Sequence, residues 1–109
     1  MDHINLDLDD YKIILSHKGR VSFVNNSCKI SKFVSNIYKT IKNDLIKAKG
    51  VLIKFGIHKE QDFLVINDLI AKINDFINED ADVIFSTYQS VNKDVEIIEY
   101  QIIISGIKR

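Results

Sequence analysis

A short run of apolar, β-favouring residues, GVLIKFGI at 50–57, lies between two segments whose apolar residues recur at helical spacing. A continuous apolar run bounded by Gly50 and the polar stretch HKEQD is typical of a strand that is buried on both faces. The helical segment before it begins at Ser27 and the one after it at Asp62, and both residues are favourable helix N-caps. The pattern predicts strands that pair in parallel through right-handed helical crossovers.

Both helical segments have one apolar face, which indicates that they pack across a sheet. The apolar positions are Ile30, Phe33, Val34, Ile37, Ile41 and Leu45 in the first segment, and Ile66, Leu69, Ile70, Ile73, Phe76 and Ile77 in the second. The other side of the first segment carries Lys29, Lys32, Asn36, Lys39 and Asn43. This basic side favours a solvated face over a nucleic-acid or membrane surface, because no aromatic residues are interleaved for base stacking.

Three further strands are predicted. RVSFV at 20–24 alternates polar and apolar residues and precedes a turn at Asn25 and Asn26, and ADVIFST at 81–87 follows the second helix. The third strand is VEIIEYQIIISGI at 95–107, and the short polar loop before it predicts that the last two strands form an antiparallel hairpin. With a short N-terminal helix over 11–15 that ends near Gly19, we predict an α+β fold. It has a four-stranded mixed sheet with two long helices on one face, and the N-terminal helix or a partner covers part of the other.

Length and composition narrow the class of protein. The chain has 109 residues, which predicts a single domain over 1–109. Fifteen basic and 15 acidic residues give a net charge of 0, which argues against non-specific binding to nucleic acid. Cys28 is the one cysteine, which favours a reducing compartment. No apolar stretch is long enough to cross a bilayer and the N-terminus is no signal peptide, so we expect a cytoplasmic protein with no membrane partner.

The usual signatures of nucleotide and metal sites are missing from the sequence. The four glycines, at 19, 50, 56 and 106, are isolated, so neither a phosphate-binding loop nor a dinucleotide fingerprint is present. His3, His17 and His58 have no ligand spacing with one another or with Cys28, so no metal site is expected. Cys28 is expected at a helix start, where the dipole lowers a thiol pKa, but without a neighbouring histidine an incidental small residue is favoured over a nucleophile.

An acidic cluster opens the chain, with Asn5, Asp7, Asp9 and Asp10 just before the short helix. Carboxylates in a first turn stabilise a helix, and Asp7 or Asp9 alone is enough for that role. The spacing Asn5-x-Asp7-x-x-Asp10 also holds two carboxylates and an amide on one tight loop. Such a trio can polarise a water molecule, or hold the water shell of a cation, near a phosphate. The phosphate would belong to another molecule.

The same stretch, INLDLDDYKIILSHKGR, resembles the synergy loop and following helix of FtsZ, the bacterial tubulin homologue. The family pattern is N-x-D-x-x-D, an apolar helix and a Gly-Lys/Arg step, which is Gly19-Arg20 here. KAKGVLIKFGI and DADVIFSTYQSVNKDVEIIEYQIIISGI resemble the strands of the C-terminal subdomain of FtsZ. The predicted element order is that of the subdomain, with 1–10 as the synergy-like loop.

The resemblance implies a site that acts on a neighbouring molecule. In FtsZ, GTP is hydrolysed between two subunits, and the synergy loop of one subunit reaches the nucleotide of the next. Carried over, Asp7 and Asp10 would position the attacking water, and Asn5 would contact the nucleotide. No GTP-binding domain is present in these residues, so the resemblance implies no GTP hydrolysis by the chain alone. It implies no cofactor of its own, and GTP and Mg²⁺ only as bound by a partner, FtsZ or an FtsZ-like protein.

Three functions remain open at this point. The first is an FtsZ-like module that caps a filament or activates hydrolysis on the subunit it contacts. The second is a non-catalytic interaction domain with the same fold, which self-associates through an uncovered sheet face or binds another partner. The third is a small enzyme with sites between subunits, and it has least support because Arg20 and Arg109 are the only arginines available for an anionic substrate.

Overall fold

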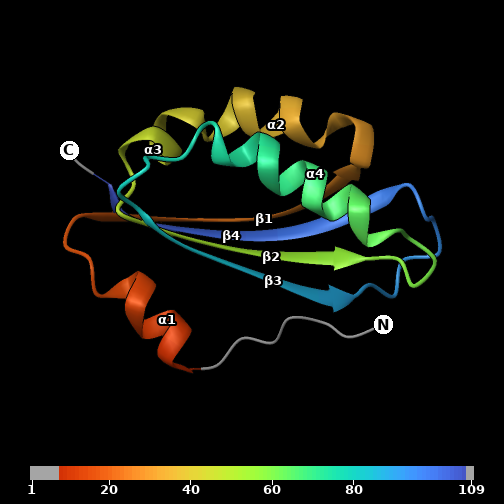
Figure 1. Cartoon of the computed structure of the whole chain (residues 1–109), viewed down its shortest axis with the longest axis horizontal. Coiled ribbons are helices and arrows are strands. Elements are labelled where there is room, and N and C mark those ends of the chain that lie inside the picture. The colour runs from red at the N-terminus through yellow and green to blue at the C-terminus, as the bar shows by residue number, and fades with distance from the viewer. Residues whose placement is uncertain (1–7, 108–109) are drawn as a thin grey trace.

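Helices cover both faces of one sheet in the computed structural model, which describes residues 8–107 (Figure 1). Helix α1 lies against one face, and α2, α3 and α4 lie across the other (Figure 1). In chain order the elements are α1 (Leu8–Leu15), β1 (Arg20–Lys29), the 3₁₀ turn η1 (Ile30–Lys32), α2 (Phe33–Thr40), α3 (Lys42–Lys47), β2 (Gly50–Ile57), α4 (Phe63–Asn74), β3 (Asp82–Gln89) and β4 (Ile97–Ile107). The predicted α+β architecture, with the long helical segments on one face and a short N-terminal helix on the other, is confirmed.

The sheet has four strands in the order β1-β4-β2-β3, so β4 lies between β1 and β2. It runs antiparallel to both neighbours, whereas β2 and β3 are parallel and connected through α4. The mixed sheet and the parallel pairing of β2 with β3 are therefore as predicted. Two predicted pairings are wrong: β1 does not pair in parallel with β2, because β4 lies between them, and β3 and β4 do not form a hairpin. The continuously apolar end of β4 fits its interior position, where both faces of the strand are covered.

The boundary between β1 and the first long helix also differs from the prediction. Asn25 and Asn26 were expected to form a turn and Ser27 to cap a helix, but all three belong to β1 and pair with β4. The ladder continues to Lys29 because β4 is long enough to match it, and the Ile30 N–H extends it by donating to the Glu96 carbonyl at 2.8 Å. This long-range pairing overrides the local N-cap signal.

The helical segment that follows is broken in two, but its predicted apolar face is retained. Ile41, with φ −128° and ψ 7°, interrupts the helix between α2 and α3. Phe33, Ile37, Ile41 and Leu45 are nevertheless all buried against the sheet. The 3.6-residue period therefore identified the packed face correctly, although it did not detect the break.

The main core fills the space between the sheet and α2–α4. The ring of Phe33 packs edge-on against Phe55 and Tyr100, with centroids 5.6 and 5.0 Å apart. Helix α4 begins as predicted, because the Asp62 carboxylate accepts a hydrogen bond from the Leu64 N–H at 2.9 Å. Across residues 8–107, no helix is long and apolar enough to cross a membrane.

Candidate functional site on the first helix

The predicted site residues lie at the start of α1. Asn5 and Asp7 fall outside the described residues. Asp10 lies in the first turn of α1 beside Asp9, and its side chain is half-buried whereas that of Asp9 is exposed. Both carboxylates are therefore placed where the partial positive charge of a helix N-terminus favours them. In this geometry the cluster can stabilise the start of the helix and also present a carboxylate at the edge of the molecule.

Helix α1 packs against the sheet through one fully buried side chain. Among Leu8–Leu15, Ile14 alone is buried, with no exposed surface. The helix packs there against β2, β3 and β4. Leu8, Ile13 and Leu15 project away from this contact and remain largely exposed. A short helix with one fully buried side chain has little apolar packing to set its orientation, so directional interactions contribute to it.

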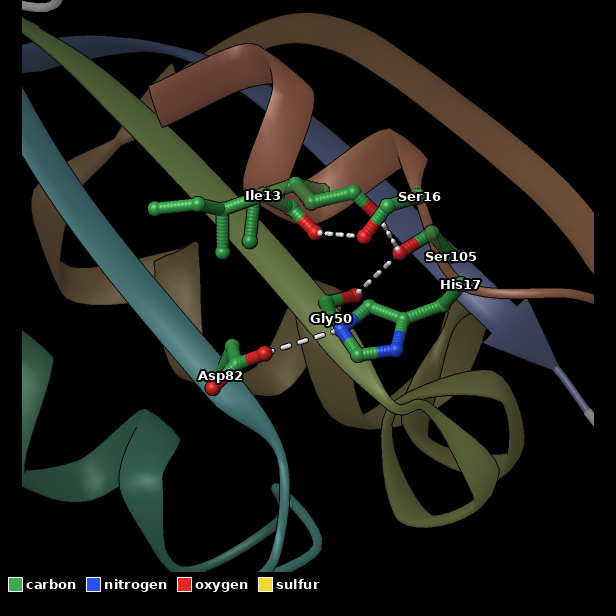
Figure 2. A network of polar contacts seen from close by, with 7 residues as sticks. Ile13, Ser16, His17, Gly50, Asp82 and Ser105 are labelled. Atoms are coloured by element: carbon green, nitrogen blue, oxygen red, sulfur yellow. Dashed lines mark hydrogen bonds and ion pairs between the residues drawn. The ribbon is translucent and has the colours of Figure 1, made fainter. Parts of the chain in front are cut away.

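Ser105 of β4 supplies one of these directional contacts. Its buried hydroxyl donates a hydrogen bond to the Ile14 carbonyl, and its oxygen lies 3.4 Å from the Gly50 carbonyl oxygen (Figure 2). The last carbonyls of a helix have no partner within the helix, so a buried donor at this point satisfies one of them. Ser16 satisfies another carbonyl in the same turn, because its hydroxyl donates to the Ile13 carbonyl at 2.8 Å.

His17 ties the end of α1 to the start of β3. Its Nε2 atom lies 2.9 Å from Asp82 Oδ2, and the histidine side chain is 25% exposed (Figure 2). Ser105 and His17 thus hold the same end of the helix at two points, one on β4 and one on β3. Two contacts on different strands fix the direction in which the opposite end of α1, with Asp10, projects.

Two glycines make this close approach possible. A Cβ atom on Gly50 would lie 2.5 Å from Ser105 Oγ and 2.9 Å from His17 Cδ2. Gly106 has a φ of +63°, and a Cβ atom there would lie 2.9 Å from the Cβ of His17. Any larger residue at either position would push the end of α1 off the sheet. Ser105, Gly50 and Gly106 were not predicted as site residues, although an isolated glycine within a strand is a known signal of close backbone approach.

A second polar cluster was also missed, and it lies between β3 and β4 across Gly56. The Tyr88 hydroxyl donates to Glu99 Oε1 at 2.8 Å, and the Ser90 hydroxyl donates to Glu99 Oε2 at 2.5 Å. Burial, together with the Glu99 carboxylate, raises the pKa of Tyr88 to about 12. Tyr88 therefore remains a protonated donor at neutral pH, and the cluster fixes the distance between two strands that are not neighbours in the sheet.

Cys28 lies in β1 rather than at a helix start, which corrects the expected environment of its thiol. Burial raises its pKa, opposed by a hydrogen bond with Asn36, so no helix dipole activates the sulfur as a nucleophile. His17 and His58 lie in different regions, and residues 8–107 contain no group of three potential metal ligands. Of the predicted catalytic and nucleotide-contacting residues, the described part of the chain contains Asp10 at the start of α1.

The fold is similar to that of FtsZ. An empty FtsZ dimer from M. jannaschii superposes with a TM-score of 0.76 at 16% sequence identity, and the match covers 96% of this chain and 32% of FtsZ. A point mutant of the same FtsZ gives a TM-score of 0.76 at 17% identity, covering 95% of this chain and 33% of the other. The GTPγS-form protofilament of Bacillus thuringiensis serovar israelensis TubZ gives 0.53 at 8% identity, covering 82% and 24%.

The chain thus spans about a third of the length of the FtsZ chains that it matches. At these identities the likeness establishes the fold, which is consistent with the predicted resemblance to the C-terminal subdomain of FtsZ. No protein-family model matches the chain, and no curated protein matches it in sequence.

Proposed function

We propose that this chain is an FtsZ-like C-terminal module that docks on the nucleotide face of an FtsZ-type subunit. There it contributes acidic residues to GTP hydrolysis or caps the filament. The proposal is supported most strongly by the fold and the N-terminal motif taken together. A fold like that of FtsZ covers 96% of the chain, and its first helix, held against the sheet by Ser105 and His17, begins within an N-x-D-x-x-D sequence.

The proposed chemistry divides between two molecules. The partner subunit binds GTP and Mg²⁺, which supply the reactive phosphate and its charge neutralisation. Asp7 and Asp10 of this chain accept hydrogen bonds from the attacking water and orient it, and Asn5 contacts the nucleotide through its amide. Ser105 and His17 act indirectly: they hold α1 in a fixed direction and therefore keep Asp10 in place. Without a partner, the chain is expected to be inactive toward GTP.

A titration into full-length FtsZ from the same organism tests the proposal, with GTP turnover and filament pelleting followed together. We expect the wild-type chain to change both quantities at substoichiometric ratios. The Asp7→Ala, Asp10→Ala double variant should lose this effect while keeping its thermal unfolding transition. Asp9→Ala is the matched control, because Asp9 is an exposed carboxylate in the same turn but outside the motif. An effect that survives the double variant, or no effect at any ratio, contradicts the proposal.

A non-catalytic interaction domain is the second candidate, and the outer surface of α1 favours it. Leu8 is 76% exposed, and Ile13 and Leu15 are also exposed. Exposed apolar side chains that lie together in this way are typical of a surface that binds a partner. Partner binding through this surface would depend on Ile13 and Leu15 and would be indifferent to Asp7 and Asp10. Two double variants in the same titration, one at Ile13 and Leu15 and one at Asp7 and Asp10, distinguish the two functions.

A further inference from the structure

The two edges of the sheet differ in how far they are covered. At the β3 edge, Ser86 and Thr87 in the middle of the strand are buried, with 2% and 4% of their surfaces exposed. At the β1 edge, Phe23 is 60% exposed, and the consecutive residues Asn25, Asn26 and Ser27 are all exposed. Within residues 8–107, β1 pairs with β4 alone. A long uncovered edge of this kind is a template for pairing with another strand.

The register of β1 shows which backbone groups are available at this edge. Residue pairs in an antiparallel ladder alternate between those that exchange hydrogen bonds and those that do not. The Ile30 N–H donates to Glu96, so the alternate pairs along the same register, including Cys28 with Ile98 and Val24 with Ile102, are the hydrogen-bonded ones. The N–H and C=O groups of Phe23, Asn25 and Ser27 therefore point away from β4.

One of these outward donors is already occupied. The Ser27 N–H donates to the side-chain oxygen of Asn26 at 2.8 Å, which closes that end of the edge. The outward N–H and C=O groups of Phe23 and Asn25 have no hydrogen-bond partner within residues 8–107. Side chains alternate along a strand, and Val24 and Cys28 pack against the core under α2–α4, so the Phe23 ring projects from the opposite face. Available backbone groups and an exposed aromatic ring thus coincide at Phe23.

We propose that β1 pairs antiparallel with β1 of a second copy of this chain, with the twofold axis passing between the two Phe23 residues. In this register each Phe23 exchanges both backbone hydrogen bonds with its symmetry mate, and Asn25 of each copy faces Val21 of the other. The two Phe23 rings and the exposed Val21 side chains then cover one another on the same face of a continuous sheet. Registers centred closer to Ser27 would require the donor that Asn26 already occupies.

Charge and symmetry identify the occupant as a second copy. An antiparallel strand pair is self-complementary about a twofold axis, so the same edge serves both partners. The charged residues of β1 are Arg20 and Lys29, at its two ends, and the eight residues between them carry no charge. In the proposed register Arg20 faces Asn26, Lys29 lies beyond the paired segment, and Arg20 is already neutralised by Asp44 at 2.7 Å. No like charges oppose each other.

Sedimentation equilibrium of the purified 109-residue chain over a wide concentration range tests the proposal. We expect the apparent mass to rise with concentration from 12.6 kDa toward twice that value. Asn25→Pro should abolish the rise, because it removes an outward N–H and leaves the ladder to β4 intact. Asn25→Thr keeps the N–H and is the matched control. A chain that stays monomeric throughout, as it would if a strand of another protein were the occupant, overturns the proposal.

A charge-swap experiment fixes the register and does not depend on the folding of the proline variant. Phe23→Glu and Phe23→Lys should each be monomeric, because like charges meet at the twofold axis, and an equimolar mixture should regain the dimer. Hydrogen exchange adds a residue-level readout. The Phe23 amide should gain protection on dimerisation, whereas the Ser27 amide should not change. A dimer that persists in both single variants contradicts pairing at Phe23. These measurements involve no FtsZ and no GTP, so their outcome is independent of the proposed function.

Discussion

The two faces of the sheet are held by different kinds of interaction. The face under α2–α4 is packed with apolar side chains, including the Phe33, Phe55 and Tyr100 rings. On the face under α1, Ile14 and Leu52 are buried outside that cluster. Polar, directional contacts through Ser105 and His17 also hold α1 there. Apolar packing provides most of the stability of a domain, whereas hydrogen bonds determine orientation. The first face should therefore control whether the chain folds, and the second how the candidate site is presented.

Removing an aromatic ring from the first face should have the largest effect. Phe33→Ala should lower the free energy of unfolding by about 3–5 kcal/mol, because it opens a cavity between α2 and the sheet. Urea denaturation measures the change. The control is Leu64→Ala on α4, whose side chain is 70% exposed and should change stability by less than about 0.5 kcal/mol. Comparable losses in the two variants would mean that this face is not the stabilising one.

Removing a hydroxyl from the second face should have a smaller and more local effect. Ser105→Ala leaves the buried Ile14 carbonyl without its donor, at a cost of about 1–3 kcal/mol. Native-state hydrogen exchange should show faster opening of α1 while the amides of α4 keep their protection. Ser16→Ala removes an exposed hydroxyl from the same turn and should leave exchange in α1 almost unchanged. Equal acceleration in α1 and α4 would show that the two faces do not respond separately.

The third expected effect is the pH dependence that Tyr88 contributes on the second face. The pKa of Tyr88 is about 12 in the folded chain, above the value of about 10 for an unperturbed tyrosine. A group whose pKa is raised by folding stabilises the folded chain below its unfolded pKa and loses that contribution as the pH rises through the folded value. Wild-type stability should therefore fall between about pH 10 and pH 12 relative to that of Tyr88→Phe. Parallel pH profiles for the two proteins, from thermal unfolding, would exclude this role for Tyr88.

Much of the fold was predictable because local sequence patterns, such as apolar runs and N-cap residues, determine many of its elements. The apolar runs at 50–57 and 81–87 became β2 and β3 within two residues, and Asp62 caps α4 as its chemistry indicated. The errors arose where pairing over long distances decided the outcome. Nothing local to Asn25 and Asn26 shows that a strand more than 70 residues later will extend β1 through them. The hairpin was wrong for a related reason, because a polar loop of ordinary length does not reveal whether the next strand pairs with its predecessor.

The motif of the candidate site was predictable from the sequence, but the residues that hold α1 in place were not. Asp10 was identified from its spacing, and the structure places it in the first turn of α1. The roles given to Asn5, Asp7 and Asp10 remain predictions. Ser105 and Gly50 were not identified because they are far from α1 in sequence, and because serine and glycine occur in strands that hold no helix in place. Their relation to Ile14 exists only once β2 and β4 lie side by side.

The central position of β4 has a consequence for the order in which the domain assembles. Residues 97–107 leave the ribosome after every other described element, yet they separate β1 from β2 and provide Ser105 for the first helix. Until they emerge, β1 has no neighbour with which to pair, and the nascent chain holds at most the parallel β2–α4–β3 unit. Folding of the whole domain is therefore a late event in synthesis, and a ribosome stalled before β4 would display β1 as an unpaired strand to whatever lies near it.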